Sequence, residues 1–339
     1  MDEYWDGYSD YDDGDINFPG KDKDLTWFRY CPSMTAILML YYLPKLRKLV
    51  TNIPTRDFDA LQKCFNMWAY QLLEEPMAKL PICFGELKTI RLENPESNEY
   101  LSFPPFQLWG LMMCPKIEDI SLHTGYKYDM FDQAMDLTEI RKLGGSTRRS
   151  TIKDLKLDFS LFPGWDTIRR VLKTTIHLQD LKILALYPEL KKTKDCDYLG
   201  PNHAISRCKD TLRCLFIGAT NQSGGFRPAE WIGDLSDFPN LRIVTLPCDI
   251  FLAKRDWRQH VNSLTKSLPP GLEELTLNEC TESHWIDLFN SGALHDILGH
   301  LQSLKKLWIE TDDILTTRGF QMEDLYTVVK RKGVNVLVK

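Results

Sequence analysis

A short spacing of apolar residues recurs along most of the chain. The segment SLPPGLEELTLNEC, residues 267 to 280, places leucines at Leu272, Leu275 and Leu277. The same spacing, an apolar anchor followed by apolar residues three and five positions later, occurs with anchors at Leu87, Ile117, Ile152, Leu181, Leu212, Leu241, Leu272 and Leu304. Successive anchors are 30, 35, 29, 31, 29, 31 and 32 residues apart. A near-constant period of this length predicts a solenoid, in which similar units stack in a row.

Weaker copies of the spacing stand at both ends of this series. Leu46 and Leu49 begin an earlier copy, with Thr51 at the third position, 41 residues before Leu87. Beyond the last full copy, the stretch GVNVLV with Val334 indicates a final strand. The complete series therefore predicts about nine or ten units.

Each copy is interpreted as a short strand followed by a helix. Alternate residues of a strand point to opposite faces, so the apolar positions point into the core and the residues at +2, +4 and +6 point away from it. Helical apolar spacing appears between strands at 57 to 75, 165 to 175 and 281 to 300. Prolines, which end a helix, stand two residues before four anchors, at Pro44, Pro115, Pro239 and Pro270. This order of elements predicts an α/β fold with a parallel sheet on the inner face and helices outside.

The pattern L-x-x-L-x-L-x-x-N/C, in units near 30 residues, resembles the leucine-rich repeat. The stretches FPNLRIVTLPCDIF and LPPGLEELTL are similar to the repeat regions of fungal F-box proteins. The resemblance covers residues 40 to 339 and implies a leucine-rich repeat solenoid, or horseshoe, with the sheet on its concave face and helices on its convex face. The position eight residues after the anchor is cysteine only at Cys280, so we expect irregular curvature.

The resemblance also implies a non-enzymatic function in protein–protein interaction, as the substrate-recognition part of an F-box ubiquitin-ligase subunit. An F-box is a helical module that docks on a cullin-ligase adaptor, and residues 1 to 40 do not resemble one. We therefore expect the adaptor as a partner only if an F-box exists outside this chain. The alternative is an interaction scaffold or effector-like repeat protein with no ubiquitin link. An enzyme on a repeat scaffold is a further alternative, but the sequence shows no convergent titratable groups for it.

The partner is expected on the concave face or on the loops at its rim. Face positions of the first units form an ordinary solvated set, namely Thr89, Arg91, Glu93, Asp119, Ser121, His123, Asp154, Lys156 and Asp158. Apolar and aromatic face positions follow, and an exposed apolar block predicts a contact surface. The predicted partner-binding residues are Ile183, Tyr187, Phe216, Ile243, Glu274, Thr276, Asn278, Lys306, Trp308 and Glu310. The alternative is that loops 191–202 and 221–228 cover this block.

Charge divides the chain into two parts. Residues 1–24 contain nine carboxylates and two lysines, whereas the whole chain has a net charge of −5. We interpret residues 1–24 as an acidic disordered arm and residues 25–339 as the repeat domain, with an N-terminal cap at about 25–45. The nearly neutral domain indicates no nucleic-acid partner. The longest apolar run, residues 34 to 43, is too short to span a bilayer, and the acidic start is unlike a signal peptide. We expect a cytoplasmic or nuclear protein with no membrane contact.

We expect no catalytic, cofactor or metal site. Cys280, His284, His295 and His300 superficially match zinc-ligand spacing, but Cys280 ends a strand, and His295 and His300 do not share a helix face. The sequence contains no Walker loop, G-x-S-x-G, H-E-x-x-H or G-x-G-x-x-G motif. The loop LGGSTRRST, residues 143 to 151, is interpreted as an inter-repeat linker, with phosphate binding or phosphorylation as the alternative.

Overall fold

The computed structural model describes only part of the chain. The described residues are 43, 45–52, 85–93, 108, 111–124, 150–159, 165–173, 175–185, 201–219, 232–252, 266–281, 284, 288, 292–310 and 335–338. Several expectations therefore lie wholly or mostly outside them, namely the 1–24 arm, the cap at about 25–45, the helix at 57–75, the linker at 143–151, and loops 191–202 and 221–228.

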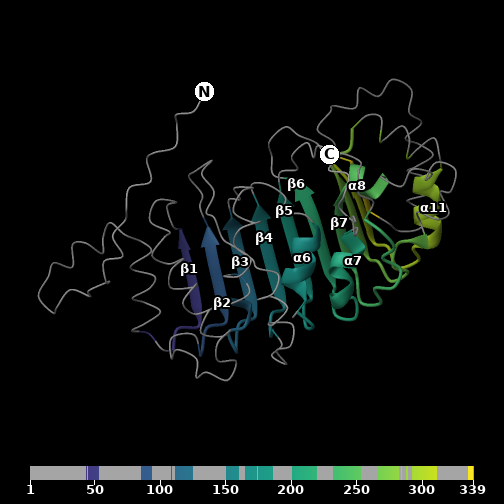
Figure 1. Cartoon of the computed structure of the whole chain (residues 1–339). Helices are drawn as coiled ribbons and strands as arrows, with labels where there is room; N and C mark the ends of the chain where they lie inside the picture. The colour runs from purple at the N-terminus through teal and green to yellow at the C-terminus, as the bar shows by residue number, and fades with distance from the viewer. Residues whose placement is uncertain are drawn as a thin grey trace, which may run out of the picture.

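Ten strands of the described residues form one sheet (Figure 1). They are β1 (Lys48–Asn52), β2 (Thr89–Glu93), β3 (Asp119–Thr124), β4 (Asp154–Phe159), β5 (Asp180–Ala185), β6 (Cys214–Ala219), β7 (Ile243–Pro247), β8 (Glu274–Asn278), β9 (Lys306–Ile309) and β10 (Asn335–Val338). Their order in the sheet equals their order in the chain, and every neighbouring pair is parallel. The chain therefore returns to the same end of the sheet before each strand, as a solenoid requires.

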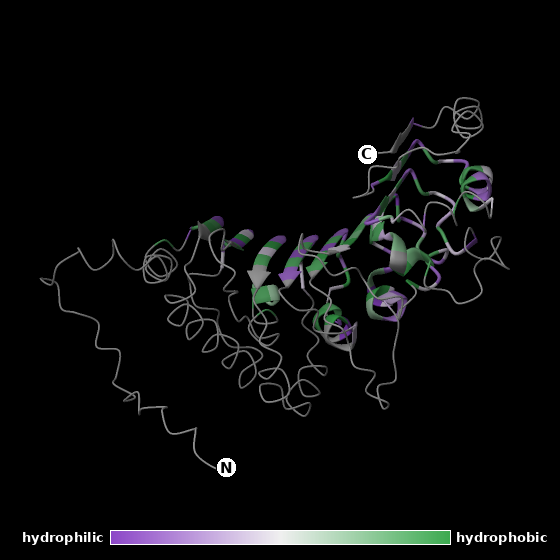
Figure 2. Ribbon diagram, turned by 90° about the horizontal axis from the view of Figure 1, so that it is seen from above, coloured by the Kyte–Doolittle hydropathy of each residue, from purple (hydrophilic) through white to green (hydrophobic). Residues whose placement is uncertain are grey.

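The described helices lie on one side of the curved sheet, its convex side (Figure 2). They are α6 (Trp165–Leu172), α7 (Pro201–Ile205) with the 3₁₀ turn Ser206–Cys208, α8 (Cys248–Leu252) and α11 (Ala293–His300). The predicted helices at 165 to 175 and 281 to 300 are represented by α6 and α11. None of the described helices is long and apolar enough to cross a membrane.

The core consists of apolar side chains repeated in register along the sheet. In β8, Leu275 and Leu277 are fully buried, while Glu274, Thr276 and Asn278 are partly exposed. One buried row joins Ile90, Ile120, Leu155, Leu181, Leu215, Val244, Leu275 and Leu307, which are paired across neighbouring strands. The repeated triplet therefore marks the core, and the α/β arrangement with a parallel sheet is confirmed.

The unit around β5 has a different register from the one expected. Leu181 lies opposite Leu155 and Leu215, so it is the second residue of its triplet, and the anchor is Leu178. An equivalent hydrogen bond in two units supports this assignment. Thr151, directly before the anchor Ile152, donates from Oγ1 to the carbonyl of the preceding anchor Ile117 at 2.6 Å. Thr211, directly before the anchor Leu212, donates in the same way to the carbonyl of Leu178 at 2.7 Å.

This register corrects the prediction for Ile183. Its side chain is 0% exposed and belongs to the core, between Leu157 and Ile217 on the neighbouring strands. The triplets Leu178-Leu181-Ile183 and Leu181-Leu184-Leu186 both fit the apolar spacing, so spacing alone could not choose between them. The face residues of β5 are instead Asp180, Lys182 and Leu184, which are partly exposed.

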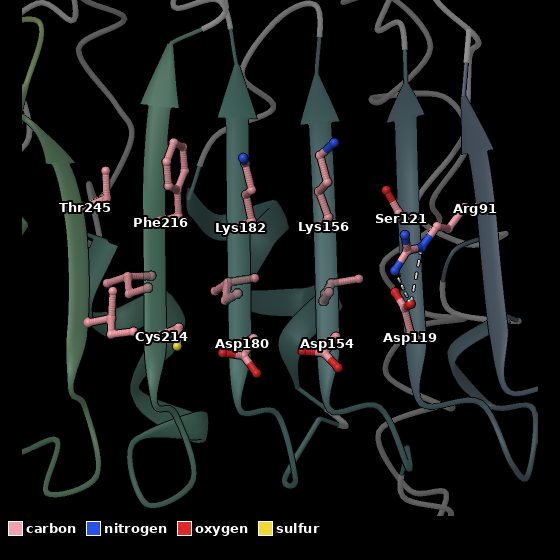
Figure 3. Close-up of a pocket in the computed structure, with 14 residues that line it drawn as sticks. Arg91, Asp119, Ser121, Asp154, Lys156, Asp180, Lys182, Cys214, Phe216 and Thr245 are labelled. Atoms are coloured by element: carbon pink, nitrogen blue, oxygen red, sulfur yellow. Dashed lines mark hydrogen bonds and ion pairs between the residues drawn. The ribbon is translucent and has the colours of Figure 1, made fainter. Parts of the chain in front are cut away.

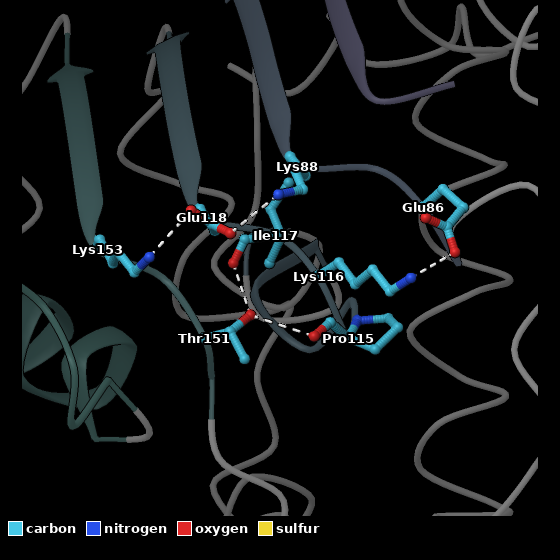
Figure 4. Close-up of polar contacts among 8 residues, drawn as sticks. All are labelled: Glu86, Lys88, Pro115, Lys116, Ile117, Glu118, Thr151 and Lys153. Carbon is cyan, nitrogen blue, oxygen red and sulfur yellow. Dashed lines mark hydrogen bonds and ion pairs between the residues drawn. The ribbon is translucent and has the colours of Figure 1, made fainter. Parts of the chain in front are cut away.

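The turns that enter the strands carry a ladder of ion pairs (Figure 4). Glu118 lies between Lys88 and Lys153, with Nζ–carboxylate distances of 3.5 Å and 3.0 Å. The hydrogen bond from Lys153 is the main reason that the pKa of Glu118 is lowered. Near the other end of the sheet, Glu273 lies in the same way between Arg242 and Lys305. These pairs are open to solvent, so each contributes little to stability.

Candidate functional site

A pocket of about 580 Å³ lies on the concave face of the sheet. Most of its lining consists of side chains at alternate positions of β2 to β7, which the pleat of each strand directs away from the core (Figure 3). The core residues Leu155, Leu181 and Leu215 complete the lining. Arg91, Asp119 and Ser121 form one end, and Cys214, Phe216, Ile243 and Thr245 form the other, with the charged side chains of β4 and β5 between them. The pocket therefore combines a charged part with an apolar part.

Three aspartates form a row near the start of neighbouring strands. Asp119, Asp154 and Asp180 are paired in register on β3, β4 and β5 (Figure 3). Neighbouring strands are about 4.8 Å apart, so these carboxylates are close neighbours. Arg91 from β2 binds Asp119, with Nη2 2.7 Å and Nε 3.3 Å from Oδ2. Among the described residues, no ion pair joins Asp154 or Asp180 to a cation.

This row shifts the ionisation of its middle member. The pKa of Asp154 is raised from 3.8 to about 6, first by partial burial and then by hydrogen bonding with Asp180 and by the charges of Asp180 and Asp119. Lys153 opposes the shift, and its influence is the smallest. At pH 6 Asp154 is therefore about half protonated, and a cation entering the row would favour its charged form.

Asp154→Asn is expected to make the protein more stable at neutral pH. Because the folded pKa of about 6 exceeds the ordinary value of 3.8, the folded state binds more protons between these values, and wild-type stability falls as pH rises through this window. Asparagine cannot ionise, so it removes that loss of stability. Above pH 7 we expect the free energy of unfolding to be about 1 kcal/mol higher than in the wild type, after allowance for solvent screening.

Urea unfolding of both proteins at several pH values between 4 and 8 measures this effect. The difference in free energy of unfolding between Asp154→Asn and the wild type should grow from pH 4 to 6 and then stay constant. Asp237→Asn, in an exposed turn outside the pocket, is the matched control. A constant difference across the whole range would contradict the role of the aspartate row.

Two lysines form a second row, two residues further along the strands. Lys156 of β4 and Lys182 of β5 are paired in register, and Lys182 is also paired with Phe216 of β6. The Lys182 Nζ lies 4.2 Å from the centre of the Phe216 ring, a cation–π contact. Burial and the charge of Lys156 lower the pKa of Lys182, whereas Asp158 raises it. The pocket therefore holds a row of carboxylates and a row of ammonium groups about 7 Å apart along the strands.

The apolar end of the pocket contains two of the predicted partner-binding residues, Phe216 and Ile243, both partly exposed. The Phe216 ring lies over Gly218, where a Cβ atom would come within 2.8 Å of its Cε1 atom. Cys214 lies beside them, and burial raises the pKa of its thiol to about 12, which makes it a poor nucleophile. Tyr187, the other predicted aromatic residue of this block, lies outside the described residues.

The other predicted residues form a separate patch on β8 and β9. Lys306 binds Glu274 at 3.3 Å and lies 4.5 Å from the centre of the Trp308 ring. Trp308 is 37% exposed and is paired with Thr276 on β8. Asn278 is partly exposed at the end of β8, and Glu310, which directly follows β9, is exposed. None of these residues lines the pocket, so the structure divides the predicted surface into two parts.

Sequence reasoning missed the charged half of the pocket. Asp119, Asp154 and Lys156 were expected to be ordinary solvated residues, and the wrong register of β5 removed Asp180 and Lys182 from the face. One signal was present: the tripeptide Asp-Leu-Lys begins both DLKLDF in β4 and DLKILA in β5. Aligning these two copies gives the observed register and places like charges on neighbouring strands.

The cysteine and histidines with zinc-like spacing make other contacts. The Cys280 Sγ lies 3.7 Å from the Leu277 carbonyl, and His284 Nδ1 lies 3.0 Å from Thr281 Oγ1. Within the described ranges, no group of three or more histidine, cysteine or acidic residues is arranged to hold a metal ion.

Comparison with known proteins adds no family to this description. No protein-family model matches the chain, and no curated protein matches its sequence.

Proposed function

We propose that this chain is a non-enzymatic protein-interaction module built as a leucine-rich repeat solenoid, and that its partner binds the concave sheet face. The observation that carries the proposal is the pocket of about 580 Å³ on that face, with Phe216 and Ile243 at its apolar end. Apolar side chains such as those of Phe216 and Ile243 are usually buried in the core. Their partial exposure beside charged groups is typical of a contact surface. The register of ten parallel strands supports the repeat architecture.

We further propose the role of a substrate-recognition subunit, on the resemblance of the repeats to those of F-box proteins. In this role the chain would select a protein for ubiquitination, and a cullin-ligase adaptor would bind through an F-box outside this chain. The second candidate is an interaction scaffold with no ubiquitin link. Both candidates use the same binding face, since fold alone does not decide between them.

Affinity purification from the native cell, with wild type and Phe216→Asp, tests the binding face. The aspartate places a carboxylate in the apolar end of the pocket, so we expect the dissociation constant of the partner to rise at least tenfold, which corresponds to about 1.4 kcal/mol, and the amount of bound partner to fall. Ser303→Asp, which adds the same charge at an exposed turn before β9, is the matched control and should retain the partner.

The result also separates the alternatives. Recovery of a cullin-ligase adaptor with the partner would support the ubiquitin-ligase role, and its absence from a complex that depends on Phe216 would favour the scaffold. An identical set of bound proteins for wild type and Phe216→Asp, with both variants folded by circular dichroism, would refute binding through the pocket.

A further inference from the structure

The charged half of the pocket specifies the chemistry of a partner more closely than the apolar half does. Its two rows run across the strands, with Asp154 and Asp180 in one and Lys156 and Lys182 in the other. Each row brings two like charges to neighbouring strands, about 4.8 Å apart. Such pairs repel each other when both members are ionised.

Neighbouring residues neutralise only the edge of this arrangement. Arg91 satisfies Asp119 at one end, and the Phe216 ring contacts Lys182 at the other. In the described part of the chain, Asp154, Asp180 and Lys156 make no ion pair with a residue of opposite charge. A partner that brings a cation to the first row and an anion to the second would relieve repulsion in both rows.

The shifts in ionisation agree with this geometry. The pKa of Asp154 is raised and that of Lys182 is lowered, so each group is displaced towards its neutral form. Burial is the first cause of both shifts, and a neighbour of like charge contributes to each. Countercharges from a partner would reverse both effects.

The separation of the rows matches an extended polypeptide. Consecutive side chains of an extended segment point to opposite sides. A segment that crosses the strands between the two rows would therefore direct one side chain to the aspartates and the next to the lysines. From β4 to β6 is two strand spacings, about 10 Å, which three steps along an extended chain cover. The fourth residue, whose side chain points to the lysine row, would therefore reach Phe216, which is in register with Lys182.

We propose that the pocket binds an extended segment of a protein partner in which a basic residue stands next to an acidic residue, the basic side chain contacting Asp154 and Asp180 and the acidic side chain contacting Lys156 and Lys182. This proposal rests on the proposed function, because it names the chemistry of the partner at the same face. A protein segment fits better than a small zwitterion, since the face continues past the pocket to Glu274, Lys306 and Trp308 on β8 and β9.

Selection from a displayed library of random nine-residue peptides tests the proposal on the full chain. Peptides are selected on wild type and counter-selected on the double variant Asp154→Asn and Asp180→Asn. We expect enrichment of peptides with adjacent basic and acidic residues. Enriched peptides without this pair, or no enrichment, would overturn the proposal.

The affinity of a synthetic copy of the most enriched peptide gives the quantitative test. Its dissociation constant should rise at least tenfold with the double asparagine variant and with Lys182→Met, and it should rise with salt concentration. Glu118→Gln, which neutralises a carboxylate in the turn ladder outside the pocket, should leave it unchanged. Equal affinity of the peptide for the wild type and all three variants would overturn the proposal. So would equal affinity of the wild type for a peptide in which serine replaces the two charged residues, or equally tight binding of free lysine.

The same variants distinguish failure of this inference from failure of the proposed function. If native partners are lost with Phe216→Asp but retained with both charge variants, the concave face binds proteins and the charge pattern is wrong. If native partners are retained with Phe216→Asp as well, the proposed function fails. Circular dichroism and thermal unfolding of each variant establish that it is folded.

Discussion

Ile183→Ala is expected to lower the free energy of unfolding by about 3 to 5 kcal/mol, because it removes three buried carbon atoms from the centre of the stack. The side chain is 0% exposed, and its register partners Leu157 and Ile217 are also 0% exposed. Each unit of a solenoid is stabilised mainly by its two neighbours, so a cavity in the middle weakens the interfaces on both sides. Equilibrium unfolding in urea measures the loss.

Ile243→Ala is the matched control for this change. It removes the same atoms, but Ile243 is partly exposed on the concave face and lines the pocket. Water can fill the space that the removed atoms leave, so no empty cavity forms. We therefore expect the free energy of unfolding to fall by less than about 1.5 kcal/mol. Equal losses for the two variants would mean that Ile183 lies on the face and that Leu181 is the anchor of its unit.

Gly233→Ala is expected to destabilise the protein by about 2 to 4 kcal/mol, from backbone strain and overpacking together. Gly233 has a φ angle of 90°, a conformation that residues with a Cβ atom rarely adopt. An added Cβ would also lie 2.4 Å from the Cβ atom of Asn202 at the start of α7. The backbone of one of the two segments must therefore move.

The contacts of Asn202 show what that movement would break. Its backbone N–H donates to the Ile232 carbonyl at 3.0 Å, and its Nδ2 donates to the Asp234 carbonyl at 2.6 Å. These bonds attach α7 to the segment that leads into β7. We therefore expect faster amide hydrogen exchange in α7 and in residues 232–240, in addition to the lower stability.

Gly299→Ala is the control for this second change. Gly299 lies in α11, its φ angle is not positive, and a Cβ atom there would have no neighbour within 4 Å. Alanine in an exposed helical position should stabilise the protein by about 0.5 to 1 kcal/mol. If both variants lost stability to the same extent, the tight turn at Gly233 would not be the cause.

The repeated triplet contained enough information to predict most of the sheet. Residues such as Leu275 and Leu277 alternate with polar residues, and alternation with a period of two specifies a strand with one buried face. A final strand was also predicted, but its register was wrong by one residue. Aligning Val334 with the anchor Leu304 would place Leu337 opposite Leu307, whereas Val336 lies there. The unit at β5 was the other exception, because its run of apolar residues satisfies the spacing in two registers.

The amino-acid sequence by itself determined the period, the direction of successive strands and the identity of nearly all core residues in the repeated triplets, because burial of apolar side chains acts within each unit. Only the tertiary structure decided which charges share a pocket. The rows of Asp154 with Asp180 and of Lys156 with Lys182 join residues 26 positions apart, and they exist because pairing Leu155 with Leu181 brings those strands into register. Register depends on packing between units, which a pattern within one unit cannot specify.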